Sequence, residues 1–225
     1  METKVIRHNE WHEVYEELSA EELKLSVYDD FIIKIMGDVK DKKILDFGCG
    51  PGVIGDALEE HDANVDDYDI NEMILKILRK RVPDKKIKHN PTEIDINTYD
   101  FVLCNLVLCI VEDDEVSEIM KIIYNSLKNG GIALVGFCNP KIFNIHETKL
   151  DKRHLTGKRY KQNHEYLKEK KEGGYFIYEK HRPIEWYSNI FKKTGFGMSK
   201  IFFTDPYDWK GKHKIKDFVI FKLKK

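Results

Sequence analysis

The stretch from Ile44 to Gly55, ILDFGCGPGVIG, constrains the fold more than any other part of this 225-residue sequence. An apolar run with β character contains one carboxylate, Asp46, and four glycines follow between Gly48 and Gly55. Glycine allows positive φ angles and lets a backbone approach a ligand closely. In open α/β sheets, ligands bind beyond the carboxyl ends of the strands, where such turns lie. The stretch therefore predicts a strand, a ligand-binding turn and a helix.

Strand-like and helix-like segments alternate along the first part of the chain. Short apolar runs predict strands at 43–47, 65–70, 86–89, 100–105 and 132–138. Apolar residues at helical spacing predict helices at 20–39, 53–60, 71–81 and 114–127. Strands that alternate with helices form a parallel sheet covered on both faces. The sequence therefore predicts an α/β fold of the Rossmann-like, doubly wound type.

The alternation stops after residue 138. Residues 139–182 are polar, basic and rich in Tyr and His, without a clean period, and we interpret them as an insertion or lid after the fifth strand. A helix framed by Pro183 and Gly195 follows. Strands at 198–204 and 215–223 have no helix between them and should pair antiparallel. We expect one domain: an N-terminal helical cap (1–40), a cofactor-binding core (41–138), the insertion (139–182), and a closing helix with the strand pair (183–225).

Composition narrows the class of protein. A content of 41% hydrophobic and 34% charged residues is typical of a globular domain. No apolar segment follows the basic residues of METKVIRHNE, and the longest apolar run, at 101–111, is too short to span a bilayer. The four cysteines form no CxxC pair, which favours reduced thiols over disulfides or a metal site. We therefore expect a cytoplasmic protein without a membrane partner or a metal, and the oligomeric state stays open.

Charge is distributed unevenly along the chain. From Lys141 onward there are 22 Lys and Arg against 10 Asp and Glu, whereas the preceding part has 16 against 29. The two parts cancel to a net charge of −1. Such a split indicates either an anion-facing surface on the last part or a solvated, lysine-rich face.

Several kinds of ligand could use the glycine-rich turn. A P-loop is excluded because no Gly-Lys-Ser/Thr follows the glycines. A dinucleotide site is a rival, since the residues from Gly50 to Gly55 satisfy GxGxxG and Asp69 lies 19 residues after Gly50. Against it, the glycines begin at Gly48, directly after the strand, and Asp46 would repel a pyrophosphate. An NAD-dependent dehydrogenase is therefore the remote alternative, and a cationic ligand is favoured.

Five stretches together resemble the class I S-adenosylmethionine-dependent methyltransferases. ILDFGCGPG resembles their first motif, an acidic residue with a GxGxG turn, and DDYDINEMIL resembles their second-strand motif. YDFVLCNLVLCIVED resembles the fourth strand and the segment after it, and LKNGGIALV the turn into the fifth. RPIEWYSNIFKKTGF is similar to the closing helix that precedes the antiparallel strands. The resemblance covers roughly 42–138 and 182–225, and it implies a seven-stranded sheet with its last strand antiparallel.

The resemblance also implies a cofactor, S-adenosylmethionine, a product, S-adenosylhomocysteine, and the residues that hold them. Asp46 would hold the amino group of the methionine part, and Asp69, with Ile70 beside it, would accept the ribose hydroxyls. The turn residues would approach the cofactor through their backbone; these are Gly48, Cys49, Gly50 and Gly52.

Other cofactor contacts are less determined. Asn90 stands where the family often places a contact to the adenine amino group, and Thr92 is nearly as good a candidate. Asn105, at the end of the fourth strand, could touch cofactor or acceptor, or be a satisfied strand-end amide. Trp11 and Tyr15, spaced i and i+4, could close over the cofactor, and packing is the alternative.

Two departures from the family leave the catalytic base unknown. Where many small-molecule members carry His after the fourth strand, this chain has Cys109 and Ile110. The Asn/Asp-Pro-Pro-aromatic signature of enzymes that methylate amide or base nitrogens is also absent. Direct in-line transfer needs an aligned nucleophile and exclusion of water, and a base only when the nucleophile is protonated. His146 and His181 in the insertion are the candidates for that base.

The insertion also supplies the candidate acceptor-binding residues Arg153, Arg159, Tyr160 and Arg182. Arginine binds carboxylates and phosphates through two parallel hydrogen bonds, so we expect a small-molecule acceptor that carries an acidic group. Nucleic acid is disfavoured because the basic residues are scattered among carboxylates and the pI is about 6.8. The alternatives are an RNA or protein methyltransferase and a cofactor-binding protein without catalysis.

Overall fold

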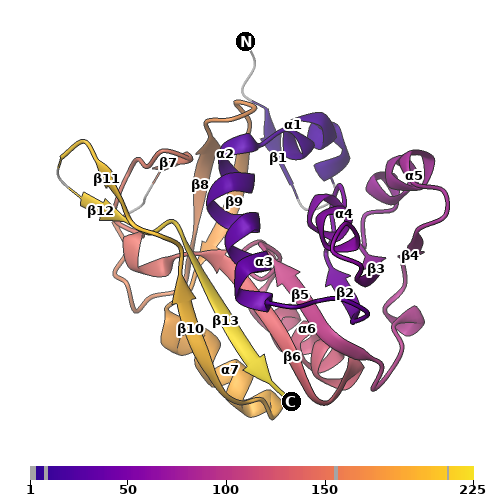
Figure 1. Cartoon of the computed structure of the whole chain (residues 1–225). Coiled ribbons are helices and arrows are strands. Elements are labelled where there is room, and N and C mark those ends of the chain that lie inside the picture. Colours follow the sequence, from indigo (N-terminus) through magenta and orange to yellow (C-terminus); the bar gives the residue numbers. More distant parts are fainter. Residues whose placement is uncertain (1–3, 8–9, 155–156, 212) are drawn as a thin grey trace.

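A computed structural model describes residues 4–7, 10–154, 157–211 and 213–225 (Figure 1). Its main body is a seven-stranded sheet in the order β10-β13-β6-β5-β2-β3-β4. The strands are β2 (Lys43–Phe47), β3 (Asn64–Tyr68), β4 (Lys86–Lys88), β5 (Tyr99–Asn105), β6 (Leu127–Cys138), β10 (Gly197–Phe203) and β13 (Phe218–Lys224).

The direction of the strands confirms the predicted fold class. Strands β6, β5, β2, β3 and β4 run parallel, whereas the last strand, β13, is antiparallel to both β6 and β10. The pairing of β5 with β6 sets Asn105 opposite Gly136, and the pairing of β6 with β13 sets Cys138 opposite Phe218. The carboxyl ends of the parallel strands therefore meet at one edge of the sheet.

Helices cover both faces of this sheet, as the alternation predicts. On one face, α6 (Asp113–Ser126) and α7 (Ile184–Thr194) bury Met120 and Tyr187 against Val102 of β5. On the other face, α3 (Asp30–Met36) and α4 (Val53–Glu59) bury Ile32 and Leu58. Each such apolar side chain contributes about 1.5–3 kcal/mol when it leaves water. Helix α5 (Glu72–Arg81) follows β3 and is capped by Asn71, whose side chain accepts from Met73 N and Ile74 N.

The N-terminal helix is less regular than the sequence predicts. A 3₁₀ turn, η1 (Trp11–Val14), and helix α1 (Tyr15–Ser19) precede α2 (Glu22–Lys24). A π-helical turn, η2 (Leu25–Asp29), then joins α2 to α3. Such turns rotate the side chains that follow and are frequent at functional sites. Tyr28 of this turn is fully buried and packs close to Gly136, where a Cβ would lie 1.9 Å from the Tyr28 hydroxyl.

The segment interpreted as an insertion folds into a second sheet, which we call the insertion sheet. It comprises β7 (Asp151–His154), β8 (His164–Lys170) and β9 (Phe176–His181), with β1 (Val5–Ile6) added parallel to β9. It lies above the carboxyl ends of β5 and β6 (Figure 1). In β8, buried Tyr166, Lys168 and Lys170 alternate with less buried residues. The sequence shows no clean period here because the buried face carries charged residues.

The remaining elements are short. A hairpin of β11 (Tyr207–Trp209) and β12 (His213–Ile215) separates the last two long strands, so β13 begins at Phe218, three residues later than predicted. Two 3₁₀ turns are η3 (Pro91–Glu93) and η4 (Pro140–Ile142). Among the helices of the described residues, none has the length and apolar character needed to cross a membrane.

Candidate active site

A cavity of about 360 Å³ lies at the carboxyl ends of the central strands. One part is lined by the glycine-rich turn after β2 and by Asp69 after β3. The other part reaches Asn105 of β5, Cys138 of β6 and Phe218 of β13, beneath the insertion sheet. One continuous space therefore joins the predicted cofactor turn to the insertion.

The glycine-rich turn can take its shape only with glycine at its first position. Gly48 has φ +80°, and a Cβ there would lie 2.3 Å from Val107 Cγ2. Gly50 has φ +53° and open space where a Cβ would stand, so its backbone faces the cavity. Gly48 N and Cys49 N both donate to the Tyr68 carbonyl, at 2.7 and 3.0 Å. These bonds tie the turn to the end of β3.

Asp69 lies beside this turn, as the spacing predicts. Its carboxylate accepts from Gly50 N at 2.9 Å and from Asn71 N at 2.8 Å, so it is fixed by the turn and by the start of α5. Ile70 follows it, 59% exposed, and lines the cavity. The pair presents a carboxylate next to an apolar edge, which suits a ribose joined to a base.

Asp46 and Asp29 bring two buried carboxylates to the same cavity. One oxygen of Asp29 accepts from Lys24 Nζ at 2.8 Å. The other oxygen of Asp29 and the Oδ2 of Asp46 find no donor within the described part of the chain. Burial, and then the neighbouring Asp67, raise the pKa of Asp46. Buried acceptors without donors are rare in proteins, so this geometry points to a ligand that supplies N–H groups.

The cavity fits S-adenosylmethionine on these observations. The ammonium of the methionine part would supply the donors that Asp46 and Asp29 lack, Asp69 would accept ribose hydroxyls, and the glycines permit close approach. Asp29 and Lys24 were not predicted from the sequence. Lys24 is the last residue of α2, and Asp29 is the last residue of the π-helical turn, which leaves no recognisable signal in an amphipathic pattern.

The other predicted cofactor residues are placed unevenly. Cys49 lines the cavity, whereas Gly52, with φ +77°, ends the turn outside the described lining. Asn90 and Thr92 are exposed and hydrogen-bond each other, with Thr92 Oγ1 donating to Asn90 Oδ1 at 2.8 Å. Pro91 between them lines the cavity instead. The adenine contacts proposed for Asn90 and Thr92 stay predictions.

Three more residues predicted to contact the cofactor lie near β5 and the N-terminal helix. Asn105 lines the cavity and its Oδ1 accepts from the Tyr28 hydroxyl at 3.3 Å. Leu106 follows with φ +59°, a strained conformation for a residue with a Cβ, and strain of this kind clusters at functional sites. Trp11 lines the cavity and meets the Tyr175 ring edge-on, whereas Tyr15 is buried away from it.

The predicted acceptor-binding arginines do not line the cavity. Arg153 is buried, 3.1 Å from Asp151 Oδ1, and it donates to the carbonyls of Ile142 and Ile145. Arg182 donates to the carbonyls of Leu108 and Val111, both at 2.6 Å. Both guanidinium groups are therefore committed to bonds within the chain.

The remaining insertion candidates also lie outside the described lining of this cavity. Arg159 is exposed, and the Tyr160 hydroxyl donates to Glu185 Oε2 at 3.1 Å. His146 is exposed. The His181 Nε2 lies 2.7 Å from the Tyr160 carbonyl, and burial lowers the pKa of His181. The binding and base roles predicted for these residues stay predictions, and the geometry gives them no support.

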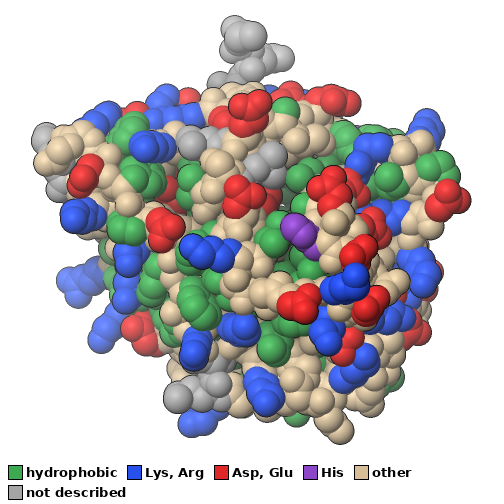
Figure 2. All heavy atoms as spheres, viewed as in Figure 1, with side chains coloured by type: hydrophobic (Ala, Val, Ile, Leu, Met, Phe, Trp, Pro, Cys, Tyr) green, Lys and Arg blue, Asp and Glu red, His purple; other side chains and the backbone are tan. Residues whose placement is uncertain are grey.

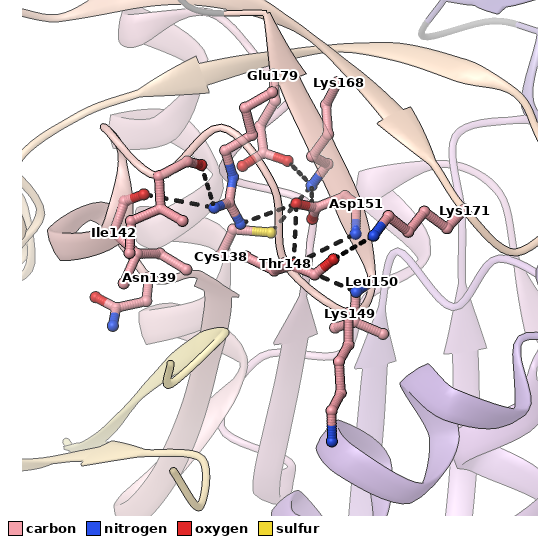
Figure 3. A network of polar contacts seen from close by, with 12 residues as sticks. Cys138, Asn139, Ile142, Thr148, Lys149, Leu150, Asp151, Lys168, Lys171 and Glu179 are labelled. Carbon is pink, nitrogen blue, oxygen red and sulfur yellow. Dashed lines mark hydrogen bonds and ion pairs between the residues drawn. The ribbon is translucent and has the colours of Figure 1, made fainter. Parts of the chain in front are cut away.

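Other charged residues of the insertion sheet line the cavity in place of the predicted arginines and histidines. Lys168 and Glu179 of the insertion sheet line the cavity and form a buried ion pair, with Asp151 beside them (Figure 3). Lys170 lines it too, 3.3 Å from Glu21 Oε2. In the sequence these residues look like a solvated charge run, and only the period-two spacing of Tyr166, Lys168 and Lys170 could have marked them. Among the described residues, no group of three His, Cys, Asp or Glu side chains is arranged to hold a metal ion.

Comparison with known proteins gives a family match over part of the chain. The model of the methyltransferase domain family matches residues 45–135, from β2 to β6. This segment is a methyltransferase domain. The resemblance to class I S-adenosylmethionine-dependent methyltransferases is thereby confirmed, and so is the fold class inferred from it.

Individual relatives agree with this assignment. The chain is similar to a ubiquinone biosynthesis O-methyltransferase of Coxiella burnetii, with 28% identity over 98 residues, 41% of this chain and 42% of that protein. The chain thus spans less than half the length of the curated relatives it matches. A methyltransferase structure from Mesorhizobium loti has a TM-score of 0.66 at 19% identity, covering 89% of this chain and all of the other.

The cofactor of this class of domain is S-adenosylmethionine, as predicted. A glycopeptide N-methyltransferase solved with S-adenosylmethionine has a TM-score of 0.63 at 12% identity, covering 88% of this chain and 92% of the other. At such identity the likeness shows the fold alone.

Proposed function

We propose that this protein transfers the methyl group of S-adenosylmethionine directly to a small-molecule acceptor bound beneath the insertion sheet. The observation that carries the proposal is the single cavity, with the glycine-rich turn and Asp69 at one end and Asn105, Cys138 and the insertion sheet at the other. The two ends suit a cofactor and an acceptor lying end to end.

The size and surroundings of the cavity favour a small acceptor. Ligand pockets are typically about 300–1,000 Å³, and a space of about 360 Å³ beneath a sheet leaves no room for a macromolecule at its inner end. On the face shown in Figure 2, Lys and Arg are interspersed with Asp and Glu instead of forming a continuous basic surface. The relative from Coxiella, named for ubiquinone biosynthesis, is consistent with a small acceptor.

The chain contributes position and exclusion of water. When bound, the cofactor supplies an activated methyl group. The glycine-rich turn and Asp69 would fix its nucleoside part, and Asp46 and Asp29 would hold its ammonium. The insertion sheet covers the carboxyl ends of β5 and β6, so an acceptor there is shielded from water. Holding the reacting atoms about 3–3.5 Å apart in line then supplies most of the rate enhancement.

The cavity supports a small acceptor, but it gives less support to the acidic group that the sequence predicts on that acceptor. That expectation depended on Arg153, Arg159 and Arg182, which lie outside the described lining of the cavity. Three lysines do line it: Lys24, Lys168 and Lys170. Each of them lies within an ion pair with a buried carboxylate, so none offers an uncompensated positive charge.

A methyl-transfer assay tests the proposal. The protein is incubated with S-adenosylmethionine labelled in the methyl group and with the small-molecule, RNA and protein fractions of the source cells. We expect label in the small-molecule fraction, and loss of at least nine-tenths of it with Asp69→Ala. Label in RNA or protein would show that the acceptor is a macromolecule and contradict the proposal. Cofactor binding without any labelled product would indicate a binding protein without catalysis.

A further inference from the structure

The buried face of the insertion sheet is charged where a purely structural sheet would be apolar. Asp151 and Arg153 of β7, Lys168 and Lys170 of β8, and Glu179 of β9 are all buried. Buried ion pairs contribute little net stability because the desolvation of both ions offsets their attraction. Of these residues Asp151, Lys168, Lys170 and Glu179 line the cavity, and their charges are better explained by a ligand than by folding.

The centre of this face is Lys168. Its Nζ forms a close ion pair with Glu179 Oε2, lies 3.8 Å from Asp151 Oδ2, and donates to Cys138 Sγ at 3.1 Å (Figure 3). Cys138 is the last residue of β6, so the bond places Lys168 at the carboxyl end of a central strand. The cofactor-binding turn follows β2 and Asp69 follows β3, on the other side of β5. Lys168 and Glu179 thus lie in the acceptor half of the cavity.

The charges in this cluster balance. Lys168 and Arg153 are the cations, and Glu179 and Asp151 are the anions. Burial opposes the ammonium, but the acidic groups Cys138, Glu179 and Asp151 outweigh it and raise the pKa of Lys168. Burial likewise opposes the carboxylate of Asp151, but Arg153 and Lys168 outweigh it and lower the pKa of that group. A further charge of either sign placed here would be buried without a counter-ion.

A neutral hydroxyl would suit both members of the ion pair. Its oxygen would accept from the Lys168 ammonium, which has three N–H donors, and its proton would be donated to a carboxylate oxygen of Glu179. The Glu179 carboxylate is held from the other side by the Tyr166 hydroxyl, which donates to Oε1 at 2.6 Å. The carboxylate is thereby oriented and remains able to accept one more hydrogen bond.

We propose that Lys168 and Glu179 bind the methyl acceptor, that the acceptor is a neutral small molecule with an alcohol or phenol group, and that Glu179 removes its proton. This inference rests on the proposed function. In the transfer, the hydroxyl oxygen forms a bond to the methyl carbon while the carbon–sulfur bond breaks and leaves its electron pair on sulfur. The proton passes to Glu179, and the product is a neutral methyl ether.

The experiment compares Glu179→Gln with a matched control, Glu169→Gln. Glu169 lies on the neighbouring strand, β8, and pairs with Lys152 on the less buried side of the same sheet, at 2.8 Å. Both variants are incubated with labelled S-adenosylmethionine and the small-molecule fraction of the source cells. Titration with S-adenosylhomocysteine checks that each variant is folded and keeps its cofactor site.

We expect Glu179→Gln to lose about 10²–10⁴-fold in transfer rate, the usual contribution of a general base, while its affinity for S-adenosylhomocysteine stays within about threefold of the native value. Glu169→Gln should keep the native rate. The residual rate of Glu179→Gln should rise with pH more steeply than the native rate, because only an acceptor already ionised can then react. A role confined to structure would not change the pH profile.

The chemical class of the product gives an independent readout. The labelled product should pass through both cation and anion exchangers at neutral pH and resist mild alkaline hydrolysis, as a neutral ether does. A charged, ester or N-methyl product, or equal rates for Glu179→Gln and Glu169→Gln, would overturn this inference and leave the proposed function intact. Absence of any labelled product from the native protein would overturn both.

Discussion

Among single residues, Asp29 and Asp46 define the end of the cavity that would receive the methionine part of the cofactor. They approach from different elements, the π-helical turn η2 and strand β2, and each buries an oxygen without a donor among the described residues. A buried polar group left unpaired costs about 1–3 kcal/mol. A bound ammonium removes that cost and opposes the rise in the pKa of Asp46 that burial causes.

We expect Asp29 to contact the ammonium of the methionine part and no other part of the ligand. Asp29→Asn should weaken binding of S-adenosylhomocysteine about tenfold, or about 1.4 kcal/mol, because a neutral amide replaces a charge-assisted partner of the ammonium. Binding of 5′-methylthioadenosine, which lacks the amino-acid part, should not change. Asp30→Asn, at the exposed neighbouring residue, is the control. Calorimetry with both ligands decides it, and equal losses for the two ligands would contradict the assignment.

At the scale of elements, Arg182 joins the end of the insertion sheet to the loop after β5. Its side chain donates to the carbonyls of Leu108 and Val111 and to Asp113 Oδ1, at 2.6, 2.6 and 2.5 Å. Lys180 N also donates to the Cys109 carbonyl at 2.7 Å. These bonds fix the loop that lines the acceptor half of the cavity.

Arg182→Met should therefore act on stability. Removal of the guanidinium leaves the buried Val111 carbonyl without its side-chain donor and the Leu108 carbonyl with only the Tyr187 hydroxyl, at 3.4 Å. We therefore expect the free energy of unfolding to fall by about 2–5 kcal/mol. Arg159→Met, at an exposed position, should change it by less than about 0.5 kcal/mol. Urea denaturation of both variants measures this. Native stability of Arg182→Met together with weaker acceptor binding would instead favour the anion-binding role predicted from the sequence.

For the whole molecule, the sequence predicts the parts whose pattern follows from local geometry. The seven strands, the glycine-rich turn and Asp69 were predictable because strand–turn–helix units have short, fixed spacings. The acceptor half was not predictable in the same way. Its buried face carries Lys168 and Glu179, which no hydrophobic period reveals, and basic residues such as Arg153 point to a ligand in the sequence but bond within the fold.

The structure places Asp69 beside the cavity but leaves Asn90 and Thr92 exposed, and local sequence could not predict this difference. Asp69 is fixed by two backbone N–H groups next to the cavity, whereas the Asn90 side chain caps the turn η3 and is exposed. A polar residue after a strand can cap the next turn or face a ligand, and sequence alone does not separate these uses. The N-terminal helix shows the converse, because its π-helical turn brings Asp29 into the cavity without any signal in the pattern.

The central claim, that the cavity is an S-adenosylmethionine site, is tested most directly by calorimetric titration with S-adenosylhomocysteine and with NAD. We expect S-adenosylhomocysteine to bind with one site per chain. Asp69→Ala should lose most of this affinity, and so should Gly48→Val, whose side chain would collide with Val107. NAD should show no saturable heat. Binding of NAD in preference to S-adenosylhomocysteine, through the same two residues, would contradict the account and identify a dinucleotide site.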